Sequence, residues 1–408
     1  MLALMRLAWR NVWRQRRRSL VTSSAMAIGI ALCMSIIAFQ DGFAVEMKRV
    51  MIDQRLGHIQ LHHPDYPGRG AMHDALSGLD ERLSQLEASA QIKAVTARLK
   101  GPALIGGPNK AEGAVIKGVD PTREERVTQS SQMVTEGRYL SKDPKQEIVL
   151  GFELAKKIEV DLGGEVVILT QAADGSMGNT LLTVVGLIST GDERTDKLGA
   201  HTHLADLQEL LVMEDKAHEL TVVTHSGTEL EELAETLRTS TTGQGAMVRT
   251  WKQIDPQTFK MIKTQEDMGV IILLIILSVA GIVILNTMMM TVFERTRELG
   301  VLKALGMRPR GVVGLITAEA AALSTISVII GLTLGGLLDW LLVTYGVKFM
   351  EGDLTFNGVR FAGRLKGMVR AEPIVQAVVL TYVISLLAAL WPALRAARLD
   401  PVKSMRQE

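Results

Sequence analysis

Four long stretches almost free of charged side chains constrain this chain more than any other feature of its sequence. They span residues 19–40, 268–293, 311–345 and 373–396. A helix needs about 20 apolar residues to cross the hydrocarbon core of a bilayer, and each stretch reaches that length. The first stretch exceeds the apolar part of a typical secretion signal and is followed by no small-residue cleavage site. We therefore predict a membrane α-helical protein with four transmembrane helices, the first of which is retained.

Basic residues at the ends of these stretches predict how the chain is oriented. Arginine and lysine are dense before residue 19, at residues 294–310 and after residue 394. The positive-inside rule assigns such flanks to the cytoplasm, and with four spans all three fall on the same side. Both termini are then cytoplasmic, and the long segment between the first two spans lies outside. The short loop 346–372 conflicts with the positive-inside rule, because it is basic and must also lie outside. The three flanks that agree with the rule outweigh it.

Helical periodicity continues on both sides of the first two spans. Residues 1–18 are basic and amphipathic, with Trp9 and Trp13 near one face. This pattern is typical of a helix that lies flat at the membrane surface. Apolar residues at helical spacing also follow the first span and precede the second. We therefore expect a helical stalk, with the first span and its stalk at 19–56 and the second pair at 251–293.

The segment 57–250 has the composition of a soluble α+β domain. Strand candidates are His58–His62, Ala114–Lys117, Glu147–Leu150, Glu165–Thr170, Leu181–Leu187 and Leu220–Thr224. Helix candidates are Leu79–Ala90, His203–Met213 and Leu230–Thr239. Because strands and helices follow one another in mixed order, we expect an insert at 121–218 within an outer unit made of 57–120 and 219–250.

The segment 294–310, between the second and third spans, is charged yet keeps apolar residues at helical spacing. Its basic residues are Arg295, Arg297, Lys303, Arg308 and Arg310. Its apolar residues are Leu299, Val301, Leu302, Ala304 and Leu305. A short amphipathic helix between two spans suits a part that another protein binds. The alternative is a solvated basic loop that only keeps this side in the cytoplasm.

No pattern in the sequence supports catalysis. The phosphate-binding motif G-x-x-x-x-G-K-[ST], the zinc motif H-E-x-x-H and the esterase motif G-x-S-x-G are absent. His58, His62, His63, His201 and His203 lie in two short groups, but surface or hydrogen-bonded histidines explain them better than a metal site does. The net charge of +1 gives no reason to expect nucleic acid. We expect no enzyme activity, no metal and no bound cofactor in this chain.

Two acidic residues, Glu319 and Asp339, fall inside the third apolar stretch. Intramembrane carboxylates can mark a proton relay. Both lie within about two turns of an expected helix end, from which a side chain can reach water. We therefore expect these two side chains to be hydrated and not to form a relay.

Four stretches of the sequence resemble those of one family of transporters. The sequence E-R-x-x-E-[IL]-G-x-x-K-A-[LI]-G occurs as Glu294, Arg295, Glu298, Leu299, Gly300, Lys303, Ala304, Leu305 and Gly306. Leu7–Arg14 resembles the family's A-x-R-N-L-x-R start, and Pro392–Pro401 resembles its P-A-x-x-A-A-x-x-x-P close. Gly57–Gln60 resembles the start of the external domain in lipoprotein-releasing permeases. Over its whole length the chain resembles permeases of the MacB, FtsX and LolC–LolE type, the type VII ABC transporters.

The resemblance implies four spanning helices and a large periplasmic α+β domain with porter-like and sabre-like subdomains on a helical stalk, in a bacterial inner membrane. It implies a second permease chain, as a homodimer or a LolC/LolE-type heterodimer, and a LolD-like ATPase dimer in the cytoplasm that uses ATP and magnesium. The segment 294–310 is then a coupling helix, followed by spans at 311–345 and 373–396 and a cytoplasmic tail at 397–408. The residues expected to couple to the ATPase are Glu294, Arg295, Glu298, Leu299, Gly300, Lys303, Ala304 and Gly306.

Lipoprotein-releasing permeases extract acylated proteins from the membrane lipid and pass them to a periplasmic chaperone. Flexible apolar residues near the outer ends of the first two spans are candidates for an acyl-chain cavity: Met34, Phe39, Phe43, Met261 and Met268. The gap Gln171–Thr180, where chaperone-capturing relatives have a hook, predicts a plain turn. A MacB-like efflux permease with a separate ATPase and an FtsX-like scaffold that transports nothing are the two alternatives.

Overall fold

The computed structural model describes most of the chain, as two compact units. The described residues are 2–14, 16–66, 70–190, 193–240, 242–347, 354–356, 359–361 and 364–400. The first unit, called here the helical unit, contains Met1–Val45, Met261–Lys348 and Arg364–Glu408. The second, the α+β unit, contains Glu46–Lys260 and Phe349–Gly363. Parts of the predicted loop 346–372 and of the predicted tail 397–408 lie outside the described residues.

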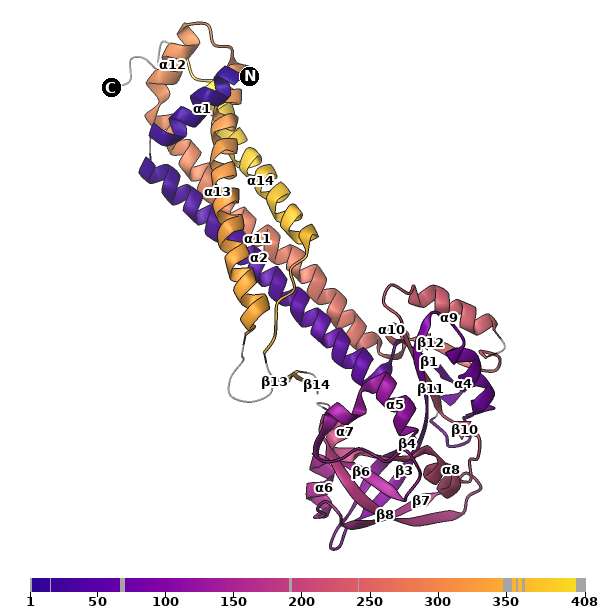
Figure 1. Ribbon diagram of the computed structural model, residues 1–408. Coiled ribbons are helices and arrows are strands. Elements are labelled where there is room, and N and C mark those ends of the chain that lie inside the picture. Colours follow the sequence, from indigo (N-terminus) through magenta and orange to yellow (C-terminus); the bar gives the residue numbers. More distant parts are fainter. Residues whose placement is uncertain are drawn as a thin grey trace. The chain divides into compact units, whose positions relative to one another are not determined.

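Long apolar helices form the helical unit (Figure 1). Its helices are α1 (Leu2–Arg14), α2 (Arg16–Met51), α11 (Pro256–Glu294), α12 (Thr296–Ala304), α13 (Pro309–Tyr345) and α14 (Ala371–Ala397). Of these, α2, α11, α13 and α14 are long and apolar enough to cross a membrane. Mixed apolar clusters join them; for example, Cys33 of α2 packs with Leu277 of α11 and Ala377 of α14. The four predicted spans are therefore confirmed as helices of sufficient length.

An extended segment within the predicted outer loop, residues 364–370, follows the side of α2. The Met368 amide donates a hydrogen bond to the Ala38 carbonyl at 2.8 Å. The Arg370 guanidinium donates two hydrogen bonds to the Asp41 carboxylate, at 2.6 and 2.5 Å. Asp41 thus compensates one of the basic residues that conflict with the positive-inside rule. We call residues 364–370 the strap.

Gly42 lets the strap approach α2 closely, and replacing it is our first prediction. A Cβ atom at Gly42 would lie 2.1 Å from the backbone carbonyl oxygen of Lys366. Because the strap would have to move, we expect Gly42→Ala to lower the free energy of unfolding by about 1–3 kcal/mol. Gly29→Ala on the same helix is the control, since its Cβ would meet only Ile276 Cγ2 at 3.6 Å. Thermal unfolding in detergent compares them, and equal melting temperatures would contradict the role of Gly42.

A ten-stranded sheet forms the frame of the α+β unit. Its strands lie in the order β12-β1-β11-β3-β4-β9-β6-β8-β5, and β7 pairs with β3 and β8. They are β1 (Ile59–His62), β3 (Ile92–Gly106), β4 (Ala111–Val119), β5 (Val134–Gly137), β6 (Glu147–Gly151), β7 (Glu165–Gln171), β8 (Met177–Ile188), β9 (Gly199–His203), β11 (Glu219–Thr224) and β12 (Met247–Thr250).

Short helices complete the unit. They are α4 (Leu79–Glu87), α5 (Pro121–Thr128), α6 (Phe152–Ile158), α7 (Glu193–Leu198), α8 (Leu204–Leu211), α9 (Leu230–Thr239) and α10 (Trp251–Ile254). Single turns of other helix types occur at η1 (Ile52–Leu56) and η2 (Ser130–Met133), and small strand pairs join β2 (Leu76–Ser77) to β10 (Lys216–Ala217) and β13 (Leu354–Phe356) to β14 (Val359–Phe361). The unit is therefore α+β, as predicted.

All six predicted strands and all three predicted helices of this unit have counterparts in the structure. The longest strand, β3, was not predicted, because Gly101 and Pro102 interrupt its apolar alternation. The gap Gln171–Thr180 is a tight turn, in which β7 ends and β8 begins with Gln171 paired to Met177. The plain turn predicted there is confirmed.

Among the described residues of the α+β unit, two large apolar cores lie beside smaller apolar clusters, and β3 contributes to both large cores. Val95 and Ala97 lie in a core with Leu61 and Leu220. Leu99 and Ile105 lie in the other core, with residues of β4, β6, β7 and β8. The cores therefore divide within β3, next to Arg98. This residue belongs to a polar network that is described below.

Candidate functional site

The predicted coupling segment forms a short helix between two long ones. α11 ends at Glu294, α12 spans Thr296–Ala304 and α13 begins at Pro309. The Thr296 hydroxyl donates to the carbonyls of Val292 and Phe293, at 3.0 and 2.9 Å, and so ties α12 to the end of α11. After α12, Gly306 has a φ of 97°, in the left-handed region that glycine tolerates best. A sharp turn therefore separates α12 from α13.

One face of α12 packs into the core of the helical unit. Leu299 is 2% exposed. It lies in one apolar cluster with Val12 of α1, Val312 of α13 and Ala396 of α14. Gly300 is buried as well. Because burial of a leucine side chain contributes about 1.5–3 kcal/mol, this face holds α12 against its neighbours.

Arginines of the N-terminal segment bind the two glutamates of the motif. Arg18 of α2 makes a bidentate ion pair with Glu294, with both N–O distances at 2.7 Å. Glu298 accepts from Arg295 Nε at 3.0 Å and lies 2.7 Å from Arg14 Nη1. Partial burial would raise the pKa of Glu298, but the two arginines outweigh it and lower that pKa. Such exposed pairs stabilise little individually, but together they fix the direction of α12.

Arg295 also connects α12 to a buried carboxylate. Its Nη1 donates to Glu319 Oε1 at 2.7 Å, and Asn11 Nδ2 of α1 donates to the same oxygen at 2.5 Å. Glu319 is only 4% exposed. The prediction that Glu319 reaches water is therefore wrong, because an ion pair inside the unit satisfies its charge. Asp339 is 3% exposed, so the same prediction fails there.

Glu319→Gln is our second prediction. Glutamine keeps the shape and can still accept from Asn11, but it loses the ion pair with Arg295. Since Arg295 retains Glu298 as a partner, we expect a moderate loss of about 1.5 kcal/mol in the free energy of unfolding. The N-terminal end of α12 should also become more accessible, which trypsin cleavage after Arg295 or Arg297 measures. Parent-like cleavage in the variant would show that Glu319 does not hold this helix.

Lys303 joins the other end of α12 to α14. Its Nζ donates to the Ala397 carbonyl at 2.8 Å and also to the Leu399 carbonyl. The last carbonyls of a helix lack partners within it and attract positive charge. All the charged residues of the motif thus have partners in this chain and position α12. Direct contact of Glu294, Glu298 and Lys303 with an ATPase stays a prediction.

The opposite face of α12 and the turn after it are exposed and apolar. Val301 is 42% exposed and Leu305 is 80% exposed. Ala304 and Gly306 are exposed beside them. We call Val301, Ala304, Leu305 and Gly306 the outer patch. The predicted apolar face is therefore divided, since Leu299 faces the core while Val301 and Leu305 face away from it.

The five candidates for an acyl-chain cavity lie at different depths in the helical unit. Met34 is 6% exposed and packs with Ile30 and Val328. Phe39, Phe43 and Met261 are half-buried, and Met268 is 46% exposed. A cavity of about 180 Å³ among the described residues of this region is lined instead by Gln40, Asp41, Gln265, Val270 and Arg370, among others. The role of the five residues in substrate binding stays a prediction.

Sequence reasoning missed the residues that anchor the motif from outside it. Arg14 and Arg18 were assigned to the orientation of the first span and to the family's N-terminal start, yet they bind Glu298 and Glu294. Asn11 and Glu319 were not connected with the motif at all. A buried carboxylate needs a partner, so the charge of Glu319 within an apolar stretch was the signal that pointed to a nearby cation.

Comparison with known proteins gives two family matches along the chain. Residues 19–240, more than half of the chain, match the family described as the MacB-like periplasmic core domain. Residues 270–401 match the FtsX-like permease C-terminal family. The chain is 22% identical over 403 residues to the lipoprotein-releasing system transmembrane protein LolC of Neisseria meningitidis serogroup B, which covers 96% of this chain and 94% of that protein.

Two other relatives align along almost the whole of this chain. Identity to the lipoprotein-releasing system transmembrane protein LolE of Haemophilus influenzae is 22% over 415 residues, 97% of each chain. Identity to the macrolide export ATP-binding/permease protein MacB of Nitrosomonas europaea is 24% over 429 residues, 99% of this chain and 59% of that protein. The chain therefore belongs to the family of ABC transporter permeases that combine a MacB-like periplasmic core domain with an FtsX-like permease domain.

Proposed function

We propose that this chain is the permease subunit of a lipoprotein-releasing type VII ABC transporter in a bacterial inner membrane. Both termini and α12 are cytoplasmic in this proposal, and the α+β unit is periplasmic. One observation carries the proposal: α12 presents the exposed outer patch on a base that ion pairs and a buried leucine hold in place. A firmly held helix with one exposed apolar face is what a coupling element requires.

The partner of the outer patch is a separate ATPase subunit. Leu305 and Val301 enter a groove on that subunit, and Arg297, Arg308 and Arg310, which are exposed nearby, favour an acidic rim around the groove. The ATPase subunits form a dimer and use ATP and magnesium, and this chain holds no cofactor of its own. A second permease chain, identical or of the LolC/LolE type, completes the complex.

Motion of α12 passes into the long helices that it contacts. α11 is continuous from Pro256 to Glu294, and α2 is continuous from Arg16 to Met51. Helices of this length transmit displacement because their backbone hydrogen bonds resist bending. In the α+β unit, the porter-like subdomain of this proposal contains 57–120 and 219–250, and the sabre-like insert is 121–218.

Lipoproteins are the proposed cargo for two reasons. The relatives that align over nearly their full length include proteins named as lipoprotein-releasing. Flexible apolar side chains, such as the exposed Met268, lie on the helices that would face the second permease chain. The alignment with MacB supports the alternative of an efflux permease that works with a separate ATPase.

Trapping the cargo tests this proposal. The permease is purified with its ATPase subunit after the ATPase is blocked by a glutamine in place of its catalytic glutamate, and bound molecules are identified by mass spectrometry. We expect acylated proteins that are absent when hydrolysis is allowed to proceed. Enrichment of small apolar molecules would instead support efflux. A complex with ATPase subunits but without cargo would support a scaffold, and no ATPase in the complex would overturn the family role of α12.

A further inference from the structure

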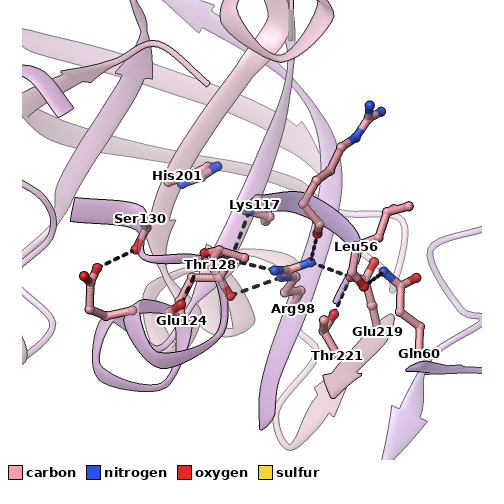
Figure 2. A network of polar contacts seen from close by, with 12 residues as sticks. Leu56, Gln60, Arg98, Lys117, Glu124, Thr128, Ser130, His201, Glu219 and Thr221 are labelled. Atoms are coloured by element: carbon pink, nitrogen blue, oxygen red, sulfur yellow. Dashed lines mark hydrogen bonds and ion pairs between the residues drawn. The ribbon is translucent and has the colours of Figure 1, made fainter. Parts of the chain in front are cut away.

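One face of the sheet in the α+β unit is polar although it is enclosed (Figure 2). Cross-strand neighbours on this face are His62 with Glu219 and Glu219 with Arg98. A second row contains Lys100 opposite Lys117 and Lys117 opposite His201. A sheet normally turns its apolar side chains towards the element that covers it. Positions where this local rule fails are frequently functional sites.

A cavity of about 550 Å³ lies against this face. It is lined by the polar residues His62, Arg98, Lys100, Lys117, His201, Glu219 and Arg249 and by apolar residues that include Met51, Leu56 and Ile254. A volume of this size holds a small molecule or a headgroup. The wall is therefore half polar and half apolar, and its polar part is mostly basic.

Arg98 is fully engaged in ion pairs and belongs to the frame of the site. It contacts Glu124 through Nη2 at 2.9 Å and Glu219 through Nη1 at 2.8 Å. Its Nη1 also donates to the Arg55 carbonyl at 2.8 Å. Glu219 further accepts from Thr221 Oγ1 at 2.6 Å. Because the two carboxylates of Glu124 and Glu219 already compensate its charge, Arg98 is not the group that would bind a ligand.

The two lysines keep spare hydrogen-bond donors. Lys100 Nζ lies 2.5 Å from Glu219 Oε2, and Lys117 Nζ lies 3.4 Å from Glu124 Oε1. Each ammonium group has three donors and uses one of them on these carboxylates. Like charges directly opposite each other on paired strands are destabilising. Lys100 and Lys117 therefore create a position that an anion between them would stabilise.

Charge counting leaves the wall positive. Arg55, Arg98, Lys100, Lys117 and Arg249 are cationic, against the two carboxylates of Glu124 and Glu219, so three positive charges remain among these described residues. Within the described part of the chain, Arg249 makes no side-chain hydrogen bond or ion pair. Burial lowers the pKa of Lys117 to about 8, and nearby cations add to this effect. An anion bound beside it would raise that pKa again.

We propose that this cavity binds a phosphate group, carried by a phospholipid headgroup or present as the free anion. Lys100, Lys117 and Arg249 supply the donors, and Met51, Leu56 and Ile254 accept the apolar part of a headgroup. Lysine and arginine both bind phosphate oxygens well. The carboxylates of Glu124 and Glu219 keep Lys117 and Lys100 in place and limit the site to one small anion. This binding is separate from the proposed role of α12.

Calorimetric titration of the full chain in a neutral maltoside detergent tests this site. The probes are dihexanoylphosphatidylglycerol, inorganic phosphate and hexyl glucoside, an amphiphile of similar chain length without phosphate. Saturable binding of the phospholipid, with weaker or no binding of phosphate, identifies a headgroup as the ligand. Equal affinity for phosphate identifies the free anion. No saturable binding of either, or equal binding of hexyl glucoside, overturns the proposal.

Two substitutions test whether the ligand binds in this cavity. Lys117→Met and Arg249→Gln should each weaken binding about tenfold, the effect of one charge-assisted hydrogen bond. Lys157→Met is the control, because Lys157 is exposed on α6 and lies 3.9 Å from Glu112 at the surface. If the Lys117→Met variant does not fold, Arg249→Gln alone tests the site. Loss of the Arg249 guanidinium leaves no carboxylate without a partner. Parent-like affinity in Arg249→Gln would overturn the site.

Discussion

Leu305→Asp is expected to abolish most of the binding between this permease and its ATPase subunit while the permease stays folded. Leu305 is 80% exposed, so the aspartate displaces no core packing. In the proposed complex, however, the same position is buried in an apolar groove, where a charge without a partner is costly. A central apolar anchor of an interface is worth 2 kcal/mol or more, which corresponds to about 30-fold weaker binding.

The measurement is the affinity of the detergent-purified permease for the isolated ATPase subunit, together with the ATP hydrolysis rate of the reconstituted complex. Leu305→Met is the matched control at the same site, because it keeps an apolar side chain of similar size. Val212→Asp controls for the added charge, since Val212 is an exposed valine of the α+β unit. Both controls should behave like the parent. Normal binding by Leu305→Asp would remove the outer patch from the coupling mechanism.

The sequence could not show which face of α12 binds the proposed ATPase subunit. The spacing of Leu299, Val301, Leu302, Ala304 and Leu305 predicts one broad apolar face. The structure divides these residues between the core and the surface, because residues of α1 and α14 that are distant along the chain, such as Val12 and Ala396, share an apolar cluster with Leu299. Periodicity reports which residues avoid water, but it does not distinguish packing within a chain from packing against another chain.

The transmembrane spans and most strands could be predicted from the sequence because each depends on a local residue pattern. An apolar run of sufficient length or a short alternating pattern predicts a helix or a strand regardless of the remainder of the chain. β3 was missed because Gly101 and Pro102 suppress the local signal, and pairing with β4 along Arg98–Gly106 forms the strand in spite of them. Strand β3 therefore forms because of pairing with a separate strand and not because of its own residue pattern.

The partners of buried charges were also non-local. The contacts of Glu319 with Asn11 and of Arg98 with Glu219 join residues 308 and 121 positions apart. A sequence shows that a buried charged residue needs a partner, but it does not show which residue is that partner. The prediction that the Glu319 side chain is hydrated was wrong for this reason. Arg98 lies in a strand that the sequence did not predict, so its network could not be expected either.

Arg98→Met is expected to destabilise the α+β unit more than any surface substitution. It leaves the carboxylates of Glu124 and Glu219, which are 0% and 2% exposed, without their main counterion. Removal of one partner of a buried ion pair costs about 3–5 kcal/mol, which lowers the melting temperature by roughly 10 °C in a unit of this size. Lys157→Met is again the control, because the side chains of Lys157 and its partner Glu112 are 43% and 41% exposed, and such a surface pair contributes about 1 kcal/mol or less.

Acid titration of stability distinguishes the lost ion pairs from lost packing. Burial would raise the pKa of Glu124, but Arg98 and Lys117 outweigh it and lower that pKa to about 2. The pKa of Glu219 is likewise well below its usual range, because Lys100 and Arg98 overcome burial. Groups with a lowered pKa stabilise the fold above the ordinary carboxyl pKa of 4.5, and this stabilisation is lost as pH falls towards 2. The parent should therefore lose stability between about pH 4.5 and 2. Arg98→Met should be much less sensitive over that range, because its carboxylates are already deprived of Arg98. If the variant were equally destabilised at every pH, its loss would come from packing and not from the ion pairs.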